Sequence, residues 1–287
     1  MQEGRPPGGL AYSHFRAYTK CRAVGALEIM GEGSEPNRTA LVTGGAKRVG
    51  LRIVERLAKA GYAVALHCSE ASRAEAEQIA ARIMAESGKA CVLACDLADP
   101  EALSRLVDTA SRQLGPLSLL VNNAAIFEED EAASLDLKIW EKHFAVNLRA
   151  PVVLSQNFAR QVPPGAEASI VNLIDQRVFR PTPQFFSYTL SKSALWTATR
   201  TMAQAFAPRR IRVNAVGPGP VLPNTSQGEA GFQHEVGGLP LHRAIGLDDI
   251  ADAVLYLATA RNVTGQMIAV DAGQHLAWQT PDIVLDH

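Results

Sequence analysis

Short apolar runs alternate with longer amphipathic segments from Arg38 almost to the C-terminus of the chain. The apolar runs are bounded by glycine or polar residues, and they are apolar enough to be covered on both faces, as the strands of a parallel sheet are. They predict β-strands at Thr39–Thr43, Ala63–Leu66, Ala90–Ala94, Leu117–Val121, Ser169–Leu173, Ile211–Val216 and Met267–Val270.

The longer segments between these runs carry apolar residues at helical spacing. They predict helices over Val49–Ala60, Ala71–Glu86, Pro100–Gln113, Leu137–Gln161, Tyr188–Ala207 and Leu247–Ala258. Asp248 and Asp249 fall in the first turn of the last one, where the helix dipole favours negative charge. Alternation of strands and helices implies right-handed βαβ units. The pattern predicts an α/β fold: a single doubly wound (Rossmann) domain over residues 38–287, with a seven-stranded parallel sheet flanked by helices on both faces.

Residues 1–37 break this pattern because they are rich in glycine, proline, serine and charge. Their apolar piece, Ala23–Met30, is interrupted by Gly25 and Glu28 and is too short and polar for a secretory signal core. We predict a disordered N-terminal extension. A natural start at Met30 is a further hypothesis, since the ordered pattern begins only after that residue.

Composition and charge narrow the classes of partner. Across 287 residues, 28 lysines and arginines balance 29 aspartates and glutamates, which gives a net charge of −1. Without a long run of one sign, the chain lacks the electrostatic footprint of a protein that binds nucleic acid or an anionic membrane, so we expect neither partner. No stretch approaches the roughly 18 to 20 apolar residues of a membrane-spanning helix, so we expect a soluble protein.

Cysteine and histidine spacing gives no sign of a metal. Cys21, Cys68, Cys91 and Cys95 show neither CxxC pairing nor a neighbouring histidine cluster, and the seven histidines are scattered without ligand spacing. We predict no metal site and no disulfide framework. Buried free thiols suit a reducing compartment, so we expect a cytoplasmic protein.

A glycine-rich turn, TGGAKRVG at residues 43–50, joins the first predicted strand to the first predicted helix. Glycines here allow a tight turn and let backbone N–H groups approach a pyrophosphate at the helix N-terminus. A glycine cluster alone is weak evidence, but its place between a strand and a helix is typical of a dinucleotide site.

The end of the second predicted strand bears on the choice of dinucleotide. Sites for NAD carry an acid roughly 20 residues beyond the glycines, which binds the ribose 2′-hydroxyl, and here Cys68 stands near that place. The missing carboxylate, together with Lys47 and Arg48 in the turn, favours the 2′-phosphate of NADP(H) over NAD. NAD stays an alternative cofactor, because a rotated loop would bring the carboxylate of Glu70 to the ribose.

Tyr188 and Lys192 stand four residues apart, which places them on one face of a predicted helix. A phenol with a pKa of about 10 is a poor acid–base catalyst at neutral pH, and a neighbouring ammonium group lowers that pKa by favouring the phenolate. We therefore expect a lowered pKa for Tyr188. The spacing alone is common and mostly structural, so it gains meaning only with the segments around it.

Further short segments accompany these motifs: Asn122-Asn123-Ala124, Asn147, Asp175, Pro218-Gly219 and Asp271-Ala272-Gly273. With the glycine turn they resemble the short-chain dehydrogenase/reductase family, and the likeness runs from about Arg38 to Ala277. The resemblance implies that Tyr188 donates a proton, that Lys192 binds the nicotinamide ribose and tunes the phenol, and that Asn147 supports a water relay.

The same resemblance implies a cofactor site and an assembly. Asp96 matches an acid that the family places near the adenine. The cofactor-binding residues it implies are Thr43, Gly44, Lys47, Arg48, Val49, His67, Cys68, Ser69, Asp96, Leu97, Asn123, Ala124, Ala125, Tyr188, Lys192, Pro218, Gly219 and Val221. Family members usually assemble through two long helices, so we expect a homotetramer. Its contacts would draw on Val152, Val153, Leu154, Leu195 and Trp196, for each of which core burial is the alternative.

Three positions narrow the resemblance to pteridine reductases and the related dihydromonapterin reductases. Arg48 replaces the middle glycine of the common turn, and Asp175 replaces the common serine thirteen residues before Tyr188. Phe127, four residues after Asn123, matches the aromatic residue that stacks over the pterin ring. In that subgroup the Asp joins the Tyr in proton delivery and the Arg lies near cofactor phosphate and substrate. The substrate-binding residues so implied are Arg48, Phe127, Asp175 and Tyr188.

These features favour an NADPH-dependent reductase that acts on a C=N bond of a pterin-like heterocycle. A carbonyl reductase or secondary-alcohol dehydrogenase, such as a 3-oxoacyl-carrier-protein reductase, is the alternative enzyme, although its usual serine is missing. A non-catalytic NADP(H) sensor is the alternative of another class, and the presence of Tyr188 and Lys192 counts against it. The region Pro223–Leu241, rich in glycine and polar residues, is the expected loop that closes over the substrate.

Overall fold

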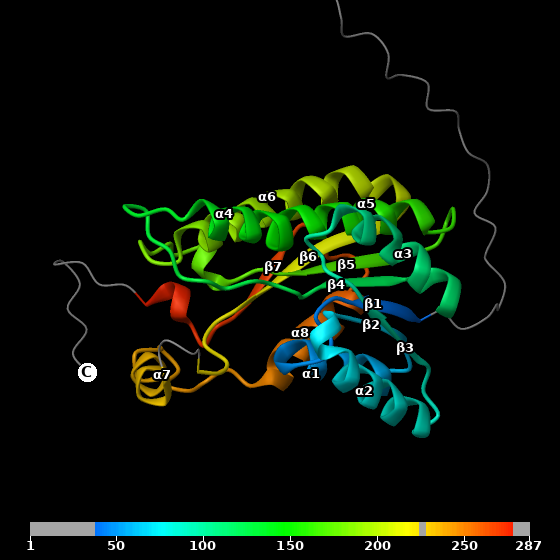
Figure 1. Cartoon of the computed structure of the whole chain (residues 1–287), viewed down its shortest axis with the longest axis horizontal. Helices are drawn as coiled ribbons and strands as arrows, with labels where there is room; N and C mark the ends of the chain where they lie inside the picture. The colour runs from blue at the N-terminus through cyan, green and yellow to red at the C-terminus, as the bar shows by residue number, and fades with distance from the viewer. Residues whose placement is uncertain (1–37, 224–227, 278–287) are drawn as a thin grey trace, which may run out of the picture. The chain divides into compact units, whose positions relative to one another are not determined.

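The computed structural model describes residues 38–223 and 228–277 (Figure 1). The predictions of a disordered extension over 1–37 and of a start at Met30 lie outside these residues. Within the described chain, the fold is built around one parallel sheet, covered by helices on both faces.

Seven parallel strands form this sheet within the described residues, in the order β3-β2-β1-β4-β5-β6-β7. The chain winds outward from β1 in one direction and, after crossing over to β4, outward in the other. This reversal between β1 and β4 opens a crevice at the carboxyl ends of the strands, the usual ligand site of such sheets. The strands are β1 (Thr39–Val42), β2 (Ala63–Cys68), β3 (Ala90–Ala94), β4 (Leu119–Asn122), β5 (Ala168–Leu173), β6 (Ile211–Pro218) and β7 (Met267–Val270).

Two hydrophobic cores lie on opposite faces of the sheet. Ile53, Leu57 and Val254 belong to one core, and Leu106 and Phe158 belong to the other. Figure 1 shows α1, α2 and α8 on one face and α3 to α6 on the other. The helices are α1 (Arg48–Lys59), α2 (Arg73–Ala85), α3 (Pro100–Leu114), α4 (Leu137–His143), α5 (Ala150–Gln161), α6 (Phe186–Phe206), α7 (Gly228–Gly237) and α8 (Leu247–Thr259).

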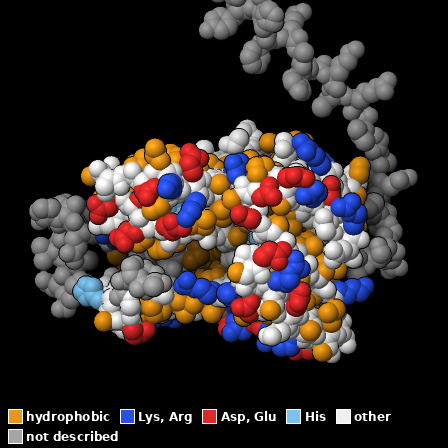
Figure 2. All heavy atoms as spheres, in the orientation of Figure 1, with side chains coloured by type: hydrophobic (Ala, Val, Ile, Leu, Met, Phe, Trp, Pro, Cys, Tyr) orange, Lys and Arg blue, Asp and Glu red, His pale blue; other side chains and the backbone are white. Residues whose placement is uncertain are grey.

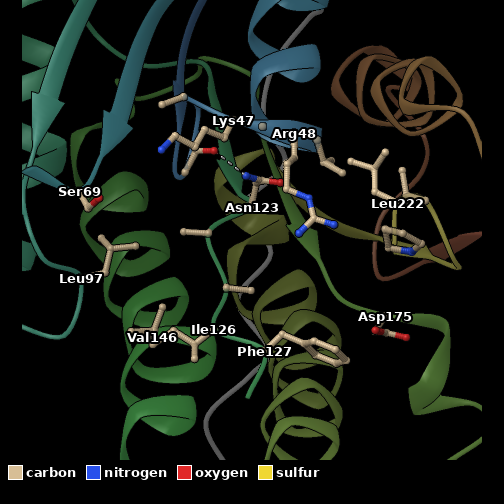
Figure 3. Close-up of a pocket in the computed structure, with 18 of the residues that line it drawn as sticks. Lys47, Arg48, Ser69, Leu97, Asn123, Ile126, Phe127, Val146, Asp175 and Leu222 are labelled. Carbon is tan, nitrogen blue, oxygen red and sulfur yellow. Dashed lines mark hydrogen bonds between the residues drawn. The ribbon is translucent and has the colours of Figure 1, made fainter. Parts of the chain in front are cut away.

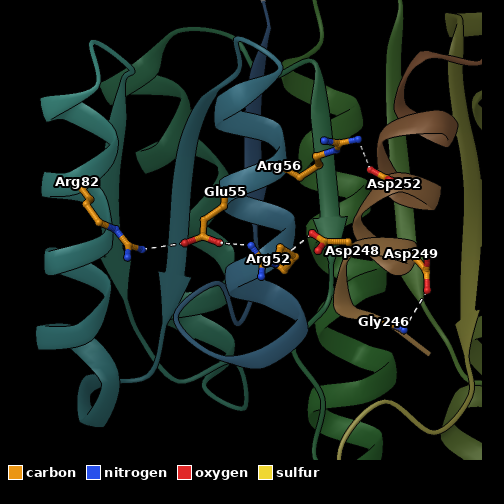
Figure 4. A network of polar contacts seen from close by, with 8 residues as sticks. All are labelled: Arg52, Glu55, Arg56, Arg82, Gly246, Asp248, Asp249 and Asp252. Atoms are coloured by element: carbon orange, nitrogen blue, oxygen red, sulfur yellow. Dashed lines mark hydrogen bonds and ion pairs between the residues drawn. The ribbon is translucent and has the colours of Figure 1, made fainter. Parts of the chain in front are cut away.

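Ion pairs link the outer surfaces of α1, α2 and α8 (Figure 4). Arg52 of α1 contacts Asp248 of α8 at 3.2 Å, and Arg82 of α2 contacts Glu55 of α1 at 2.9 Å. Exposed pairs of this kind contribute little to stability, so the apolar contacts beneath them hold the helices in place. The carboxylate of Asp249 accepts the N–H of Gly246 at 3.0 Å, which confirms its predicted place at the start of the last helix.

The predicted helix over Leu137–Gln161 forms as one helical segment, but it contains a π-helical turn that was not predicted. The chain forms α4, then a π-helical turn over Phe144–Arg149, then α5. Pro151 stands in the first turn of α5, where its ring nitrogen offers no N–H to the turn before it. A π-helical turn accommodates this loss, and such turns are frequent at functional sites.

The region Pro223–Leu241 also differs from the expected loop, because it contains helix α7. Phe232 and Val236, one helical turn apart, are the buried residues of this helix. Glycines at both ends of α7 hid this pair from the sequence pattern, which is why the helix was missed. The residues proposed for subunit contacts also differ in burial. Leu154 is buried in one of the two cores and Leu195 in a smaller cluster with Ile174 and Ala215, whereas Val152, Val153 and Trp196 are only partly buried.

Candidate active site

A cavity of about 920 Å³ lies at the carboxyl ends of the strands, where the strand order reverses. Figure 2 shows this hollow on the surface, with lysine and arginine side chains at its rim. Its wall includes these residues from the sequence prediction: Gly44, Lys47, Arg48, Val49, His67, Cys68, Ser69, Asp96, Leu97, Asn123, Ala124, Ala125, Phe127, Asp175, Tyr188, Pro218, Gly219 and Val221. Among the described residues, Thr43, Asn147 and Lys192 lie behind this wall.

The glycine turn is fixed against the strand ends by side chains of its neighbours. Asn123 donates from Nδ2 to the carbonyl oxygens of Thr43 at 2.8 Å and Gly44 at 3.1 Å (Figure 3). Gly44 has a φ of 64°, a left-handed conformation that glycine adopts without strain. At Gly50 a Cβ would collide with the carbonyl oxygen of Gly44, so the close approach of helix and turn requires glycine there.

Thr43 anchors this turn from below rather than facing the cavity. Its hydroxyl oxygen accepts the N–H groups of Asn123 and Ala124, both at 3.0 Å. Thr43 thereby ties the end of β1 to the segment after β4, the two walls of the crevice.

The N-terminus of α1 is suited to a phosphate group. Its capping position, Lys47, makes no capping bond through its side chain to the described residues, and the first turn of α1 holds no acid. Helix α3, by contrast, is capped by the carboxylate of Asp99. Uncapped N–H groups at a helix N-terminus favour an anion, and the first residues of α1, Arg48 to Gly50, line the cavity. The donor set present therefore fits the pyrophosphate of a dinucleotide.

Arg48 adopts a φ of 51°, the left-handed region that a long side chain rarely occupies. At this left-handed position the side chain adds a guanidinium group to the turn. Figure 3 shows the guanidinium of Arg48, the ring of Phe127 and the carboxylate of Asp175 around one space.

At the end of β2 the cavity wall carries the hydroxyl of Ser69 and the carboxylate of Glu70, which is already paired. Ser69 is exposed and lines the cavity, whereas Cys68 beside it is 2% exposed. Both oxygens of Glu70 accept hydrogen bonds from Arg73, at 2.7 and 2.8 Å. The carboxylate of Glu70, which left NAD as an alternative, is thus paired with the first residue of α2.

His67 braces the glycine turn, a role that sequence reasoning missed. Its Nδ1 accepts the N–H of Gly44 at 3.2 Å, and its Nε2 lies 3.2 Å from the carbonyl oxygen of Cys95. Burial lowers the pKa of His67 to about 4, so the ring is neutral and its Nε2–H donates to Cys95. The imidazole therefore connects the turn after β1 with the end of β3.

Asp175 and Tyr188 form a hydrogen-bonded carboxyl–phenol pair on the cavity wall. The hydroxyl of Tyr188 donates to Oδ2 of Asp175 at 2.9 Å, and Oδ1 of Asp175 accepts the N–H of Arg177 at 2.8 Å. Burial raises the pKa of Asp175, against the opposing effects of Arg177 and Lys192. Burial, followed by the charge of Asp175, raises the pKa of Tyr188 well above 10.

The expected lowering of the Tyr188 pKa by Lys192 is therefore wrong. Nζ of Lys192 donates to the carbonyl oxygen of Leu173 at 2.8 Å and lies 5.7 Å from the centre of the Tyr188 ring. Burial lowers the pKa of Lys192 to about 8. The motif spacing could not show this, because it contains no information on burial or on the carboxylate beside the phenol.

Asn147 lies in the π-helical turn and holds the segment that carries Phe127. Its Oδ1 accepts the N–H of Ile126 at 2.8 Å, and its Nδ2 donates to the carbonyl oxygen of Ile126 at 2.9 Å. Nδ2 also lies 3.2 Å from the hydroxyl of Ser191. The side chain thus positions the cavity wall, and its part in a water relay stays a prediction.

A buried polar group behind Tyr188 was not anticipated. Nδ1 of His143 lies 2.6 Å from the hydroxyl of Ser187, and its Nε2 accepts the N–H of Glu128 at 3.1 Å. The carboxylate of Asp130 accepts the N–H of Ser187 at 3.0 Å. These bonds tie the segment after Phe127 to the first turn of α6. They join residues 15 to 57 positions apart, and no local pattern marks them.

Comparison with known proteins shows the family to which the chain belongs. A family model described as enoyl-(acyl carrier protein) reductase matches residues 44–275. A short-chain type dehydrogenase/reductase from Picea abies is 32% identical over 83% of this chain and 92% of its own. The chain belongs to the short-chain dehydrogenase/reductase family of oxidoreductases.

Two solved structures and one curated reductase are further relatives of this chain. The structure of FolM alternative dihydrofolate reductase 1 from Brucella canis, complexed with NADP, is 51% identical, with a TM-score of 0.81 over 87% of this chain and 98% of that one. The Brucella suis protein, also in complex with NADP, is 52% identical, with a TM-score of 0.80 over 86% of this chain and 99% of that one. L-xylulose reductase from Bos taurus is 34% identical over 82% of this chain and 96% of its own.

None of the helices in the described part of the chain is long and apolar enough to cross a membrane. Over residues 38–223 and 228–277, no three His, Cys, Asp or Glu side chains gather as they would around a metal ion.

Proposed function

We propose that this chain is an NADPH-dependent reductase that reduces a C=N bond of a pterin-like heterocycle. The observation that carries the proposal is the Asp175–Tyr188 pair, which lies on the same cavity wall as Phe127 and Arg48. The proposal is also supported by the 51% and 52% identity of this chain to the FolM alternative dihydrofolate reductases that were solved with NADP.

The cofactor would lie along the carboxyl ends of β1, β2, β3 and β4. The N–H groups at the start of α1 would hold its pyrophosphate, and Lys47, Arg48 and Ser69 would surround the 2′-phosphate. Asp96, whose Oδ1 accepts the N–H of Ala98 at 2.8 Å, would border the adenine. When bound, the cofactor supplies the hydride that adds to the ring carbon of the substrate.

Proton delivery falls to Tyr188 and Asp175. Because its pKa stays well above 10, the phenol of Tyr188 is protonated at neutral pH and can donate to the ring nitrogen as the C=N π bond breaks. Asp175 lies 2.9 Å away, and its raised pKa keeps a larger share of its carboxyl protonated than in an exposed aspartate. That carboxyl returns a proton to the phenolate, which a serine hydroxyl does much less readily.

Phe127 and Arg48 would hold the substrate. The ring of Phe127 is 41% exposed and offers an apolar face to a flat heterocycle. The guanidinium of Arg48 points into the same space and can donate to ring nitrogen or oxygen atoms (Figure 3). Lys192 is fixed by the carbonyl oxygen of Leu173 behind the cavity wall, where it would lie beside the nicotinamide ribose.

The direct test is oxidation of NADPH by the purified protein with a dihydropterin, with dihydrofolate and with simple ketones. We expect turnover of the heterocycles that the variant Asp175→Ser largely loses while it still binds NADPH. A ketone activity that exceeds the heterocycle activity, and that Asp175→Ser retains, would instead support the carbonyl reductase. Binding of NADPH without any turnover would support the sensor.

We also propose a cytoplasmic homotetramer, in keeping with the family resemblance. The partly buried Val152, Val153 and Trp196 on α5 and α6 are the side chains available for subunit contacts. Four chains of 30.8 kDa give a mass that light scattering separates readily from that of one chain, and a single-chain mass would contradict the proposal.

A further inference from the structure

Phe127 is one layer of a three-part stack with Phe185 and Arg177. Its ring lies 4.2 Å from the ring of Phe185, with 13° between the two planes. The guanidinium carbon of Arg177 lies 5.3 Å from the centre of the Phe185 ring. Among the described residues, Phe127 and Arg177 line the cavity and Phe185 does not, so Phe185 supports Phe127 from outside the substrate space.

The backbone of Phe185 is strained. It has a φ of 55° and a ψ of 47°, the left-handed conformation, at the residue that precedes α6. An aromatic residue there is a conformational outlier, because its Cβ crowds the following carbonyl oxygen, and glycine or asparagine would fit with less strain. Outliers of this kind persist where the surrounding structure imposes them, and they gather at functional sites.

The surroundings of Phe185 do impose this conformation. The N–H of Phe186 donates to the carbonyl oxygen of Asp130 at 3.2 Å, and the N–H of Ser187 donates to the Asp130 carboxylate at 3.0 Å. Arg177 is itself held, since its Nη1 donates to the hydroxyl of Thr182 at 2.5 Å. These bonds hold the backbone that follows Phe185 and the arginine that packs on its ring.

The stack also defines the angle between Phe127 and the catalytic phenol. The ring of Phe127 stands at 86° to the ring of Tyr188, with 4.7 Å between their centres. A ring held in one plane can accept a flat bicyclic ligand by offset stacking without first losing rotational freedom. A nonplanar substrate would gain nothing from this arrangement.

We propose that Phe185, held in a left-handed backbone and backed by Arg177, is a positioning residue that fixes the plane of Phe127 and so selects flat heteroaromatic substrates. The choice of substrate rests on the proposed function, whereas the fixing of the ring does not. Phe185 acts through Phe127 and touches neither cofactor nor substrate.

The test compares Phe185→Gly with Phe185→Tyr. Glycine removes the ring and relieves the left-handed strain, so we expect a melting temperature within about 3 °C of the parent. The KM for dihydropterin should rise about three- to tenfold, the size of an aromatic pair contribution to binding, while the KM for NADPH stays unchanged. Phe185→Tyr keeps the ring and should restore the parent KM.

Phe179→Leu is the matched control, because Phe179 is a nearby exposed aromatic residue that packs on Trp196, 6.5 Å away, and does not line the cavity. It should leave both KM values as they are. Equal KM values for dihydropterin in the parent and in Phe185→Gly would overturn the selection of flat substrates, as would a parallel rise in the KM for NADPH.

A second readout does not depend on turnover. With 4-fluorophenylalanine at position 127, the ¹⁹F resonance of the parent protein should carry the ring-current shift of the stacked Phe185 ring. Phe185→Gly should lose that shift and Phe185→Tyr should keep it. An unchanged ¹⁹F spectrum in Phe185→Gly refutes the support of Phe127, whatever the substrate. Absence of dihydropterin turnover in the parent refutes the proposed function and the substrate choice, and the ¹⁹F result then still decides the support.

Discussion

Replacement of Asp175 by asparagine should make the protein less active and, at neutral pH, more stable. Asparagine keeps the shape of the side chain, and its oxygen can still accept the N–H of Arg177, which lies 2.8 Å from Oδ1 of Asp175. Its amide cannot return a proton to the phenol of Tyr188, which lies 2.9 Å from the other carboxyl oxygen. The loss of one general acid should lower kcat for a dihydropterin about 10²- to 10³-fold.

The pH dependence follows from the raised pKa of Asp175. A carboxyl whose pKa is higher in the folded protein contributes stability below its unfolded pKa of about 4, and this is lost as the pH rises through the folded value. The parent should therefore lose stability over that range, and Asp175→Asn should not. The same group must be protonated to serve as an acid, so the activity of the parent should fall across its folded pKa.

Two assays check these expectations together. Thermal unfolding of the parent and of Asp175→Asn, followed between pH 4 and 8 as a rough working range, should show a difference that grows with pH in favour of the variant. The pH profile of kcat should lose its alkaline fall in the variant. A variant that is less stable than the parent at neutral pH, or that keeps the same alkaline fall, would refute the assignment of Asp175 as the acid.

Two further predictions concern the cofactor end of the cavity. The pKa of His67 is lowered to about 4, so its neutral form adds stability above its unfolded pKa, and about 3 kcal/mol should be lost as the pH falls from about 6.5 to 4. His67→Gln should flatten that acid loss in a denaturant titration series, and an equally steep loss in the variant would contradict the role of the ring. Ser69→Asp should raise the KM for NADPH about tenfold or more and lower the KM for NADH, because a carboxylate repels the 2′-phosphate and accepts the 2′-hydroxyl. Unchanged steady-state KM values for both cofactors would place the ribose elsewhere.

Much of the fold could be predicted because its signals are local. A buried parallel strand such as Thr39–Val42 is a nearly continuous apolar run, and a turn with glycine at 44 and 50 identifies the crossing from strand to helix. Helix α7 was missed because its glycines masked one apolar pair, and the π-helical turn was missed because it changes the hydrogen-bond pattern without ending the helical segment.

The support of the site could not be predicted, because it comes from tertiary packing. Asp130 and Ser187 are 57 residues apart, and nothing in either segment marks the other. The pKa of Tyr188 depends on its burial and on Asp175, so a rule based on the spacing of Tyr188 and Lys192 gave the wrong sign. Sequence motifs identified which residues lie together at the candidate site, whereas the packed structure determines whether these residues are protonated.

The π-helical turn between α4 and α5 also changes the direction in which the side chains after it point. In an unbroken α-helix, His143 and Asn147 would share one stripe with Leu154 and Phe158. An extra residue in the turn rotates all that follows by about 100°, so the two stripes diverge. One continuous segment can therefore point polar side chains at the site and apolar ones into the core.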